Sequence, residues 1–307
     1  MSRSDSATEC PLLSILIPTF NDDASQLVYA LRNLALSEGI THEIVVGDDA
    51  SATRMEWVEK VVALDGVRTV RPDHNLGRAA IRNLMADNAH GQWLLFVDSD
   101  ALVEGDFSLL AYLLAGQQEA VVCGGLRHPD KNPNPAATLR YKYERKADKH
   151  RSAAHRARTP YHQLSTFNLL IRKDVFEKIG GFDSNCKEYG YEDVLLGAIL
   201  KQFGIGILHI DNPLVHSGLD SNADFIAKTE ASLRTLQRMR EKMQGLSAID
   251  NMASHIRALG LTPIVRRMFR WNRGFLRHNL LGDHPSLFLF NCYKLGYYVS
   301  LPPDSSS

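Results

Sequence analysis

The sequence has few cysteines, no excess of either charge and no long apolar run. Its four cysteines, Cys10, Cys123, Cys186 and Cys292, are scattered without a CxxC pair, which is typical of a reduced, cytosolic chain without a disulfide framework or zinc site. The 35 basic and 35 acidic residues cancel, so nothing in the overall charge attracts nucleic acid, and we expect no nucleic-acid partner.

No segment predicts a membrane span. The longest apolar runs, near Leu12 and Leu94, have the length of strands. Met1 to Cys10 is polar and lacks the charged and apolar regions of a signal peptide. We therefore expect a cytoplasmic protein that is soluble or lies peripherally on the inner face of the cytoplasmic membrane.

The chain has enough length and apolar content for a large core. It contains 307 residues, of which 44% are hydrophobic, and this excludes wholesale disorder. One large α/β domain with an appended region and two small domains both fit this size.

Strand and helix patterns alternate through the first half of the chain. Short apolar segments predict strands at 12–18, 43–47, 67–70, 93–97 and 121–122. Apolar residues at helical spacing predict helices at 22–36, 53–64, 77–88 and 107–115. Continuous apolar strands that alternate with helices favour a parallel, doubly wound sheet.

The pattern changes after Gly125. The segment Arg127 to Pro160 is polar, basic and contains prolines, with a helix predicted over 136–149. Further along we expect order at 164–171, a helix at 191–203, two short strands within 207–216 and a long helix at 223–243.

Acidic residues directly follow two of the predicted strands. Asp48-Asp49 ends one, and Asp98-Ser99-Asp100 ends another. Ligands bind at this edge of open parallel sheets, although Asp and Ser also cap ordinary turns. Two acidic pairs on one edge favour a functional site. Carboxylates one residue apart suit magnesium or manganese, which also bind substrate phosphates.

Glu192-Asp193 precedes an apolar helical segment, after Gly180-Gly181 and Gly190. Acids in a first helical turn complement the helix dipole, and this alone explains them. The functional interpretation is a general base, because an ionised Asp can accept a proton from an attacking hydroxyl. Both interpretations stay open on this motif alone.

Two further motifs are ambiguous by themselves. His216 follows a strand and is a metal ligand only if the fold brings it near Asp100, whereas His209 is interpreted as structural. Asn75-Leu76-Gly77-Arg78, followed by Arg82-Asn83, opens a helix whose N–H groups and arginines suit a phosphate. Arg78 and Arg82 are one turn apart and also fit a solvated face.

Taken in order, these motifs resemble those of family 2 glycosyltransferases. The matching segments are Ser14–Asn21, Glu43–Ser51, Asn75–Asn83, Asp98–Asp100, and the block of Phe167–Ile171, Gly180–Asp183 and Glu192–Asp193. The resemblance covers about Leu12 to His216, with Ala50 where the family often has Gly and Phe20 where Tyr is common. It implies the GT-A fold, an α/β fold with a mostly parallel sheet flanked by helices.

The resemblance also implies a domain organisation. A catalytic domain would span 11–220, with a nucleotide-sugar half at 11–125 and an acceptor half at 126–220, and a helical extension would span 221–307. The segment from Tyr141 to Pro160 and the chain beyond Asn222 look like the subset that builds bacterial surface polysaccharides.

Site roles follow from the resemblance residue by residue. The donor-binding residues would be Pro18, Thr19, Phe20, Asn21, Asp48, Asn75, Gly77, Arg78, Arg82, Asp98 and Ser99, with Asp48 on the base and Asp98 near the ribose. The ligands of manganese or magnesium would be Asp100, Asp98 and His216. Asp193, with Glu192 beside it, would be the base of a single-displacement, inverting transfer.

The function predicted on this basis is transfer of a hexose from a nucleotide diphosphate sugar, a UDP-sugar, to a glycan or lipid-linked acceptor. A sugar-1-phosphate nucleotidyltransferase is an alternative, but it needs a glycine-rich basic loop where this chain has the acidic segment Thr19 to Asp23. A non-catalytic nucleotide-sugar-binding protein is another, and it would not need Asp193.

The C-terminal part carries two stripes on one predicted helix that begins at Thr262-Pro263. One stripe is basic, with Arg266, Arg270, Arg273 and Arg277; the other is apolar, with Ile264, Met268, Trp271 and Phe275. A basic face opposite an aromatic face predicts contact of 262–280 with an anionic membrane. The alternative is that the apolar stripe packs on the catalytic domain while the arginines are solvated. Gly274 weakens the helix, and both stay open.

Overall fold

The computed structural model describes residues 11–52, 56–184, 191–240 and 247–302. Cys10, Cys186 and Gly190 lie outside these residues. So do the start of the helix predicted over 53–64 and the end of the one predicted over 223–243.

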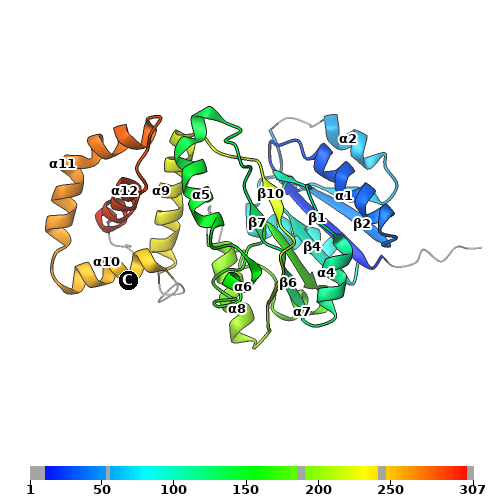
Figure 1. Ribbon diagram of the computed structural model, residues 1–307. Helices are drawn as coiled ribbons and strands as arrows, with labels where there is room; N and C mark the ends of the chain where they lie inside the picture. The colour runs from blue at the N-terminus through cyan, green and yellow to red at the C-terminus, as the bar shows by residue number, and fades with distance from the viewer. Residues whose placement is uncertain (1–10, 53–55, 185–190, 241–246, 303–307) are drawn as a thin grey trace, which may run out of the picture.

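A mixed sheet forms the centre of the molecule (Figure 1). Within the described residues it has seven strands in the order β3-β2-β1-β4-β8-β6-β9. Their bounds are β1 Leu13–Thr19, β2 His42–Asp48, β3 Val67–Val70, β4 Trp93–Val97, β6 Val121–Cys123, β8 Asn168–Arg172 and β9 Leu208–His209. All neighbours are parallel except β8, which runs antiparallel to β4 and β6. The expected mostly parallel sheet is therefore confirmed.

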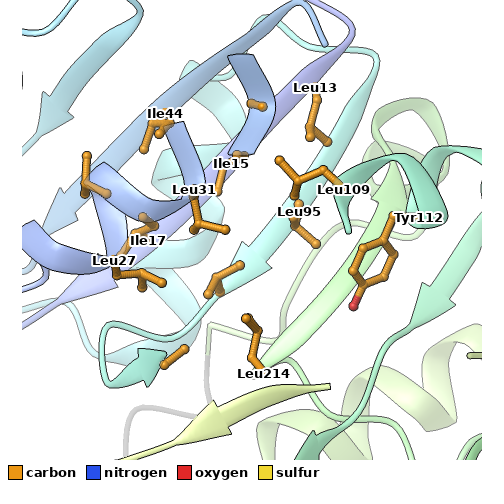
Figure 2. Close-up of a cluster of buried hydrophobic side chains, with 14 of the residues drawn as sticks. Leu13, Ile15, Ile17, Leu27, Leu31, Ile44, Leu95, Leu109, Tyr112 and Leu214 are labelled. Carbon is orange, nitrogen blue, oxygen red and sulfur yellow. The ribbon is translucent and has the colours of Figure 1, made fainter. Parts of the chain in front are cut away.

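Helices cover both faces of this sheet, which explains why its central strands are largely apolar and buried. The flanking helices are α1 Ser25–Ser37, α2 Glu56–Val62, α3 Arg78–Asn88, α4 Leu109–Gly116, α7 Lys173–Lys178 and α8 Glu192–Gln202. Successive side chains of β1 point to opposite faces. Ile15 and Ile17 join the cluster in Figure 2 with Leu27 and Leu31 of α1, whereas Leu16 joins the cluster on the other face.

A small second sheet crosses the end of the first. It consists of β5 (Ala101–Leu102), β10 (Leu214–His216) and β7 (Leu126–Arg127). In this sheet His216 pairs with Ala101, the residue after the Asp98-Ser99-Asp100 turn. The pairing brings together two segments that are more than 100 positions apart in the sequence.

The remaining helices form the second half of the chain. They are α5 Thr138–Asp148, preceded by a 3-10 turn at Pro135–Ala137, then α6 Ala153–Arg156, α9 Asn222–Arg238, α10 Ala248–Ala258, α11 Thr262–Leu281 and α12 Leu287–Ser300. Figure 1 shows α10, α11 and α12 on the side away from the sheet, with α5 and α9 between. Their core includes Leu139 of α5 and Leu195 of α8. Among the described helices, none combines the length and the apolar composition that a membrane span requires.

The apolar stripe of α11 faces outward. Ile264, Met268, Trp271 and Phe275 are all more than half exposed, with Trp271 at 70%. The buried face consists instead of Phe269, Leu276 and Leu280. The alternative in which this stripe packs on the catalytic domain is therefore wrong.

Three arginines of the basic stripe reach neighbouring elements, whereas Arg270 is exposed. Arg266 donates from Nε to the carbonyl of Val299 (2.9 Å) and from Nη2 to that of Leu301 (3.1 Å). Arg273 and Arg277 lie 3.9 Å and 3.7 Å from Glu230 Oε1. Backbone carbonyls and a carboxylate on neighbouring elements thus bind three arginines, although Arg273 and Arg277 remain 51% and 44% exposed.

A candidate donor and cation site at the sheet edge

The loops after β1, β2 and β4 meet at one edge of the sheet because these strands are parallel neighbours. They enclose a cavity of about 450 Å³. Its wall includes these predicted site residues: Pro18, Thr19, Phe20, Asn75, Gly77, Arg78, Arg82, Asp98, Ser99 and Asp100. Asp22, Asp49, Ile81 and Lys228 complete it. The cavity has the size and the charged lining of a small-ligand site.

Asp49 closes the N-terminal end of α3. Its carboxylate accepts hydrogen bonds from the backbone N–H groups of Leu76 (2.7 Å) and Gly77 (2.9 Å), and Asn75 Nδ2 donates to its carbonyl (3.0 Å). Gly77 has a φ of +85°, which side chains rarely permit. The two N–H groups expected to suit a phosphate therefore bind Asp49, and the positive charge at this end comes from Arg78 and Arg82.

Asp48 and Asn21 are not among the described residues that line this cavity. Asp48 is buried and accepts hydrogen bonds from the N–H (3.0 Å) and hydroxyl (2.5 Å) of Ser51, and it pairs with Arg71. Asn21 accepts a hydrogen bond from the Ala52 N–H (2.9 Å). These contacts join the loops after β1 and β2, and the role of Asp48 in base binding stays a prediction.

Arg82 is the most deeply buried charge of the site, with 2% of its side chain exposed. Its Nη2 donates to Asp98 Oδ1 (2.5 Å) and its Nη1 to the carbonyl of Arg78 (3.1 Å). Its Nε is buried without a hydrogen-bond partner among the described residues. The carboxylate of Asp98 is thus directed at Arg82, and its expected part in cation binding stays a prediction.

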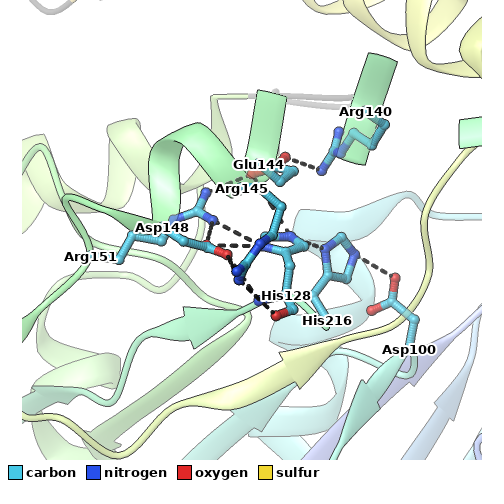
Figure 3. A network of polar contacts seen from close by, with 8 residues as sticks. All are labelled: Asp100, His128, Arg140, Glu144, Arg145, Asp148, Arg151 and His216. Carbon is cyan, nitrogen blue, oxygen red and sulfur yellow. Dashed lines mark hydrogen bonds and ion pairs between the residues drawn. The ribbon is translucent and has the colours of Figure 1, made fainter. Parts of the chain in front are cut away.

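Asp100 and His216 form the pair that suits a divalent cation. His216 Nε2 lies 2.9 Å from Asp100 Oδ2, and both side chains line a connected cavity of about 160 Å³ (Figure 3). Burial opposes ionisation of Asp100, but the hydrogen bond to His216 and the charges of His216 and Arg78 hold the pKa of Asp100 below its ordinary value. No group of three or more His, Cys, Asp or Glu side chains gathers for a metal within the described ranges. An oxygen and an imidazole nitrogen nevertheless fit Mn²⁺ or Mg²⁺ when substrate phosphates supply further ligands.

Comparison with protein families identifies the family of this chain. The family model described as Glycosyl transferase family 2 matches residues 14–180, more than half of the 307 residues. The chain belongs to glycosyl transferase family 2. This confirms the resemblance seen in the sequence motifs, of which those from Ser14 to Ile171 lie within the matched residues, whereas Gly181–Asp183 and Glu192–Asp193 lie beyond them.

Curated relatives match this family 2 chain over part of their length. The chain is 31% identical over 96 residues to the succinoglycan biosynthesis protein ExoO of Rhizobium meliloti, covering 31% of this chain and 27% of that protein. It is 26% identical over 118 residues to the putative glycosyltransferase EpsH of Bacillus subtilis, covering 38% and 34%. These matches thus span about a third of each relative.

Solved structures confirm the GT-A fold. The mannosyltransferase PcManGT from Pyrobaculum calidifontis, in complex with GDP-Man and Mn²⁺, superposes with a TM-score of 0.56 at 13% identity, over 95% of this chain and 86% of that one. S. aureus TarS gives a TM-score of 0.52 at 16% identity, over 94% and 54%. Identity this low shows the shared fold and no shared substrate.

The predicted base of this family 2 chain lies within electrostatic reach of Arg82 and Asp98, two residues that line the donor cavity. Asp193, in the first turn of α8, accepts a hydrogen bond from Thr166 Oγ1 (2.5 Å), and Glu192 lies 3.5 Å from Arg78 Nη1. Burial and the charge of Glu192 raise the pKa of Asp193 to about 6. The hydrogen bond from Thr166 and the charge of Arg82 act to lower this pKa, and the charge of Asp98 acts to raise it. A carboxyl group with this pKa is ionised at neutral pH and can accept a proton.

A buried polar network behind His216 was not expected from the sequence. It consists of His128 just after β7, of Arg140, Glu144 and Asp148 on α5, and of Arg151 between α5 and α6 (Figure 3). Burial lowers the pKa of His128, although Asp148 and Glu144 oppose this. The sequence showed only a lone histidine and a basic helix here. His209, by contrast, has structural contacts with Arg156 and the Pro160 carbonyl.

A larger cavity of about 750 Å³ adjoins the site between α5, α9, α10 and α12. Its wall is mainly apolar and includes Tyr143, Phe225, Leu233, Met252, Phe288 and Leu295. Arg140 also lines the cavity that holds Asp100 and His216, and Lys228 lines all three cavities. The mainly apolar cavity thus adjoins the cavity of the Asp100–His216 pair, and the side chains of Arg140 and Lys228 line both.

Proposed function

We propose that this chain is a cation-dependent, inverting hexosyltransferase whose donor is a nucleotide diphosphate sugar, specifically a UDP-sugar. The observation that carries this proposal is the arrangement of three groups around Arg78 and Arg82. Both arginines line the donor cavity, and Arg78 also lines the cavity of the Asp100–His216 pair. The charge of Arg82 acts on Asp193, the proposed base.

Each residue has a task in such a transfer. Arg78 and Arg82 would attract and orient the donor diphosphate, and the unsatisfied Nε of Arg82 would gain a partner. Mn²⁺ or Mg²⁺, held by Asp100 and His216, would neutralise charge on the leaving diphosphate. Asp193, held by Thr166, would take the proton of the acceptor hydroxyl as that oxygen attacks the anomeric carbon. A single displacement inverts the configuration at this carbon.

The proposed acceptor is a glycan carried on a lipid phosphate. Its support is the 750 Å³ apolar cavity with cations on its wall. Lys294 lies over the rings of Tyr143 (5.2 Å) and Phe290 (4.8 Å), and burial lowers its pKa. An anion beside Lys294, Arg140 and Lys228 would be favoured by charge, while an aliphatic chain would fill the apolar remainder.

The proposed location is the inner face of the cytoplasmic membrane, in the synthesis of a cell-surface polysaccharide. Ile264, Met268, Trp271 and Phe275 give α11 an exposed apolar stripe, and Arg267 stacks on Trp271 at 4.4 Å. Such a helix suits the interface of an anionic bilayer. ExoO, by its name, acts in succinoglycan biosynthesis, which supports the polysaccharide role.

Thermal melting with nucleotide sugars tests donor and cation together. A ligand that binds the native state raises the apparent stability. We expect the melting temperature to rise with a UDP-sugar plus Mn²⁺, to rise less with the UDP-sugar alone, and to lose the Mn²⁺ increment in Asp100→Ala. Asp174→Asn, on the exposed Arg172–Asp174 pair, is the matched control and should keep the increment. If only GDP-sugars raised the melting temperature, the assignment of a UDP-sugar donor would be contradicted. If Mn²⁺ did not change the melting temperature of the wild type with a UDP-sugar, the requirement for a cation would be contradicted.

A further inference from the structure

Four side chains form a continuous line from the interior to the proposed cation site (Figure 3). Asp148 Oδ1 lies 3.0 Å from His128 Nδ1, and His128 Nε2 lies 3.1 Å from His216 Nδ1. His216 Nε2 then lies 2.9 Å from Asp100 Oδ2. Both nitrogens of both rings are therefore engaged, and the donor and acceptor roles along the line depend on one another.

A neutral imidazole has one N–H and one lone pair, which limits the line to two arrangements. In the first, His128 donates from Nδ1 to Asp148, accepts at Nε2 from His216 Nδ1–H, and leaves the lone pair of His216 Nε2 toward Asp100. In the second, His128 donates from Nε2 to His216 Nδ1, and His216 donates from Nε2 to Asp100.

The surroundings of His128 permit both arrangements. In the first arrangement, His128 Nδ1 carries a proton and donates it to Asp148. In the second, His128 Nδ1 is unprotonated and can accept a hydrogen bond from Arg151 Nη1, which lies 3.2 Å away. Arg151 is itself held by Asp148 (2.7 Å) and Glu144 (2.7 Å). Nδ1 of the buried His128 thus has a carboxylate acceptor and a guanidinium donor within hydrogen-bonding distance.

The two arrangements differ in what Asp100 can share with His216. The first arrangement sets two lone pairs 2.9 Å apart at His216 Nε2 and Asp100 Oδ2, where no donor relieves their repulsion. The second sets two lone pairs 3.0 Å apart at His128 Nδ1 and Asp148 Oδ1, but there Arg151 can donate to His128 Nδ1, so the second arrangement is favoured without a cation. A divalent cation held by Asp100 and His216 would need a lone pair from each of them, which only the first arrangement offers.

Resting on the proposed cation-dependent function, we propose that His128 and Asp148 are positioning residues that set the tautomer of His216 for cation binding. The change from the second arrangement to the first leaves each imidazole ring with one N–H proton. The proton on His128 Nε2 crosses to His216 Nδ1, His216 Nε2 gives its proton to water, and His128 Nδ1 takes one from water through Asp148. No net charge changes within the pair of histidines, and the lone pair of His216 Nε2 becomes available beside Asp100.

The protonation of the histidine ring nitrogens in the wild type tests this change of tautomer directly. With ¹⁵N-labelled imidazoles, NMR distinguishes protonated from unprotonated ring nitrogens. We expect addition of UDP and Mg²⁺ to exchange the protonation pattern of both His128 and His216, whereas His209 should not change. A change at His216 alone, or none at His128, would overturn the proposal.

Cation affinity gives a second test that does not require turnover. Electron paramagnetic resonance measures free Mn²⁺, so a titration in the presence of UDP gives the dissociation constant of Mn²⁺ from the protein. Loss of such an outer partner typically weakens metal binding by about 10–100-fold, and we expect this for His128→Leu. His128→Gln keeps a group near His216 Nδ1 and should lose less. His209→Leu, which removes another buried histidine, should keep wild-type affinity.

The outcomes separate this proposal from the function on which it rests. Tight Mn²⁺ binding by the wild type with equal affinity in His128→Leu would overturn the role of His128 alone. Absence of Mn²⁺ binding by the wild type would overturn the cation-dependent function as well. If His128→Leu does not fold, His128→Gln and the wild-type spectra still decide the matter.

Discussion

Gly218 lies directly against the carboxylate of Asp100. A Cβ at position 218 would come within 2.2 Å of Asp100 Oδ2 and 2.8 Å of Asp100 Cβ. Real Cβ contacts are not this close, so the absence of a side chain at position 218 fixes where Asp100 lies. Ser217 adds a hydrogen bond from its hydroxyl to the carbonyl of Asp100 (2.8 Å). The segment after β10 therefore supplies both His216 and the space for its partner.

Gly218→Ala should weaken cation binding with little loss of stability. The new methyl group would push the carboxylate of Asp100 away from His216, because Asp100 is partly exposed and can move. We expect Mn²⁺ affinity in the presence of UDP to fall roughly tenfold or more. Gly274→Ala, at a glycine of α11 where an added Cβ would meet only open space, is a control for the substitution itself. Unchanged affinity in Gly218→Ala would contradict the position assigned to the cation.

Asp193→Asn should lower turnover and raise stability at alkaline pH. A raised pKa means that the folded state binds the proton more tightly than the unfolded chain, so stability decreases as pH rises from about 4 to about 6. The neutral amide removes this penalty while its oxygen can still accept from Thr166. We expect a higher melting temperature than wild type at pH 8 and a smaller difference below pH 5.

Loss of a general base should reduce turnover by about 10²–10⁴-fold. In the wild type, turnover should decrease as pH falls below about 6, because protonated Asp193 cannot accept a proton. Wild-type turnover in Asp193→Asn at pH 8 would show that another group is the base.

Arg82→Met should destabilise the fold strongly, whereas Arg172→Met should not. Arg82 is buried and pairs with Asp98, so its loss leaves a carboxylate without its partner, which costs about 3–5 kcal/mol for buried pairs. The Arg172–Asp174 pair is exposed and contributes about 0–1 kcal/mol. Urea unfolding of both variants measures this difference. Equal midpoints would contradict the structural weight given to the Arg82–Asp98 pair.

Trp271→Ser with Phe275→Ser should release the protein from anionic vesicles. These side chains protrude from α11 and would enter the bilayer interface, so their removal eliminates most of the apolar contact. Leu114→Ser with Phe203→Ser replaces exposed apolar residues elsewhere and should leave binding unchanged. Co-sedimentation with vesicles containing phosphatidylglycerol measures the effect. Retained binding by the α11 variant would exclude this helix as the membrane contact.

Most of the predicted donor residues line one cavity, and the sequence could group them because its signals are local. Pro18 lies at the end of an apolar strand, Asp49 and Asp98 follow two others, and parallel pairing brings the ends of adjacent strands to one edge. The Asp100–His216 pair was predicted through the family resemblance. What joins them is the pairing of β10 with β5, a contact of two-residue strands that leaves no pattern in the chain.

Other features could not be read from the sequence because they depend on distant partners. The apolar residues of β8 are the same for either strand direction, so its antiparallel pairing was not predicted. His128 is informative only once His216 and Asp148 lie beside it. Arg266, Arg273 and Arg277 of α11 have partners because Glu230 and the carbonyls at the end of α12 lie beside them.

The most direct test of the whole account is the anomeric configuration of the product. The purified chain would be incubated with Mn²⁺, UDP-hexoses and a lipid diphosphate-linked sugar, and the product would be analysed by NMR. The account predicts transfer of the hexose with inversion and release of UDP. Retention of configuration would contradict the single displacement at Asp193. Transfer of the nucleotidyl group, or nucleotide binding without any turnover, would contradict glycosyl transfer itself.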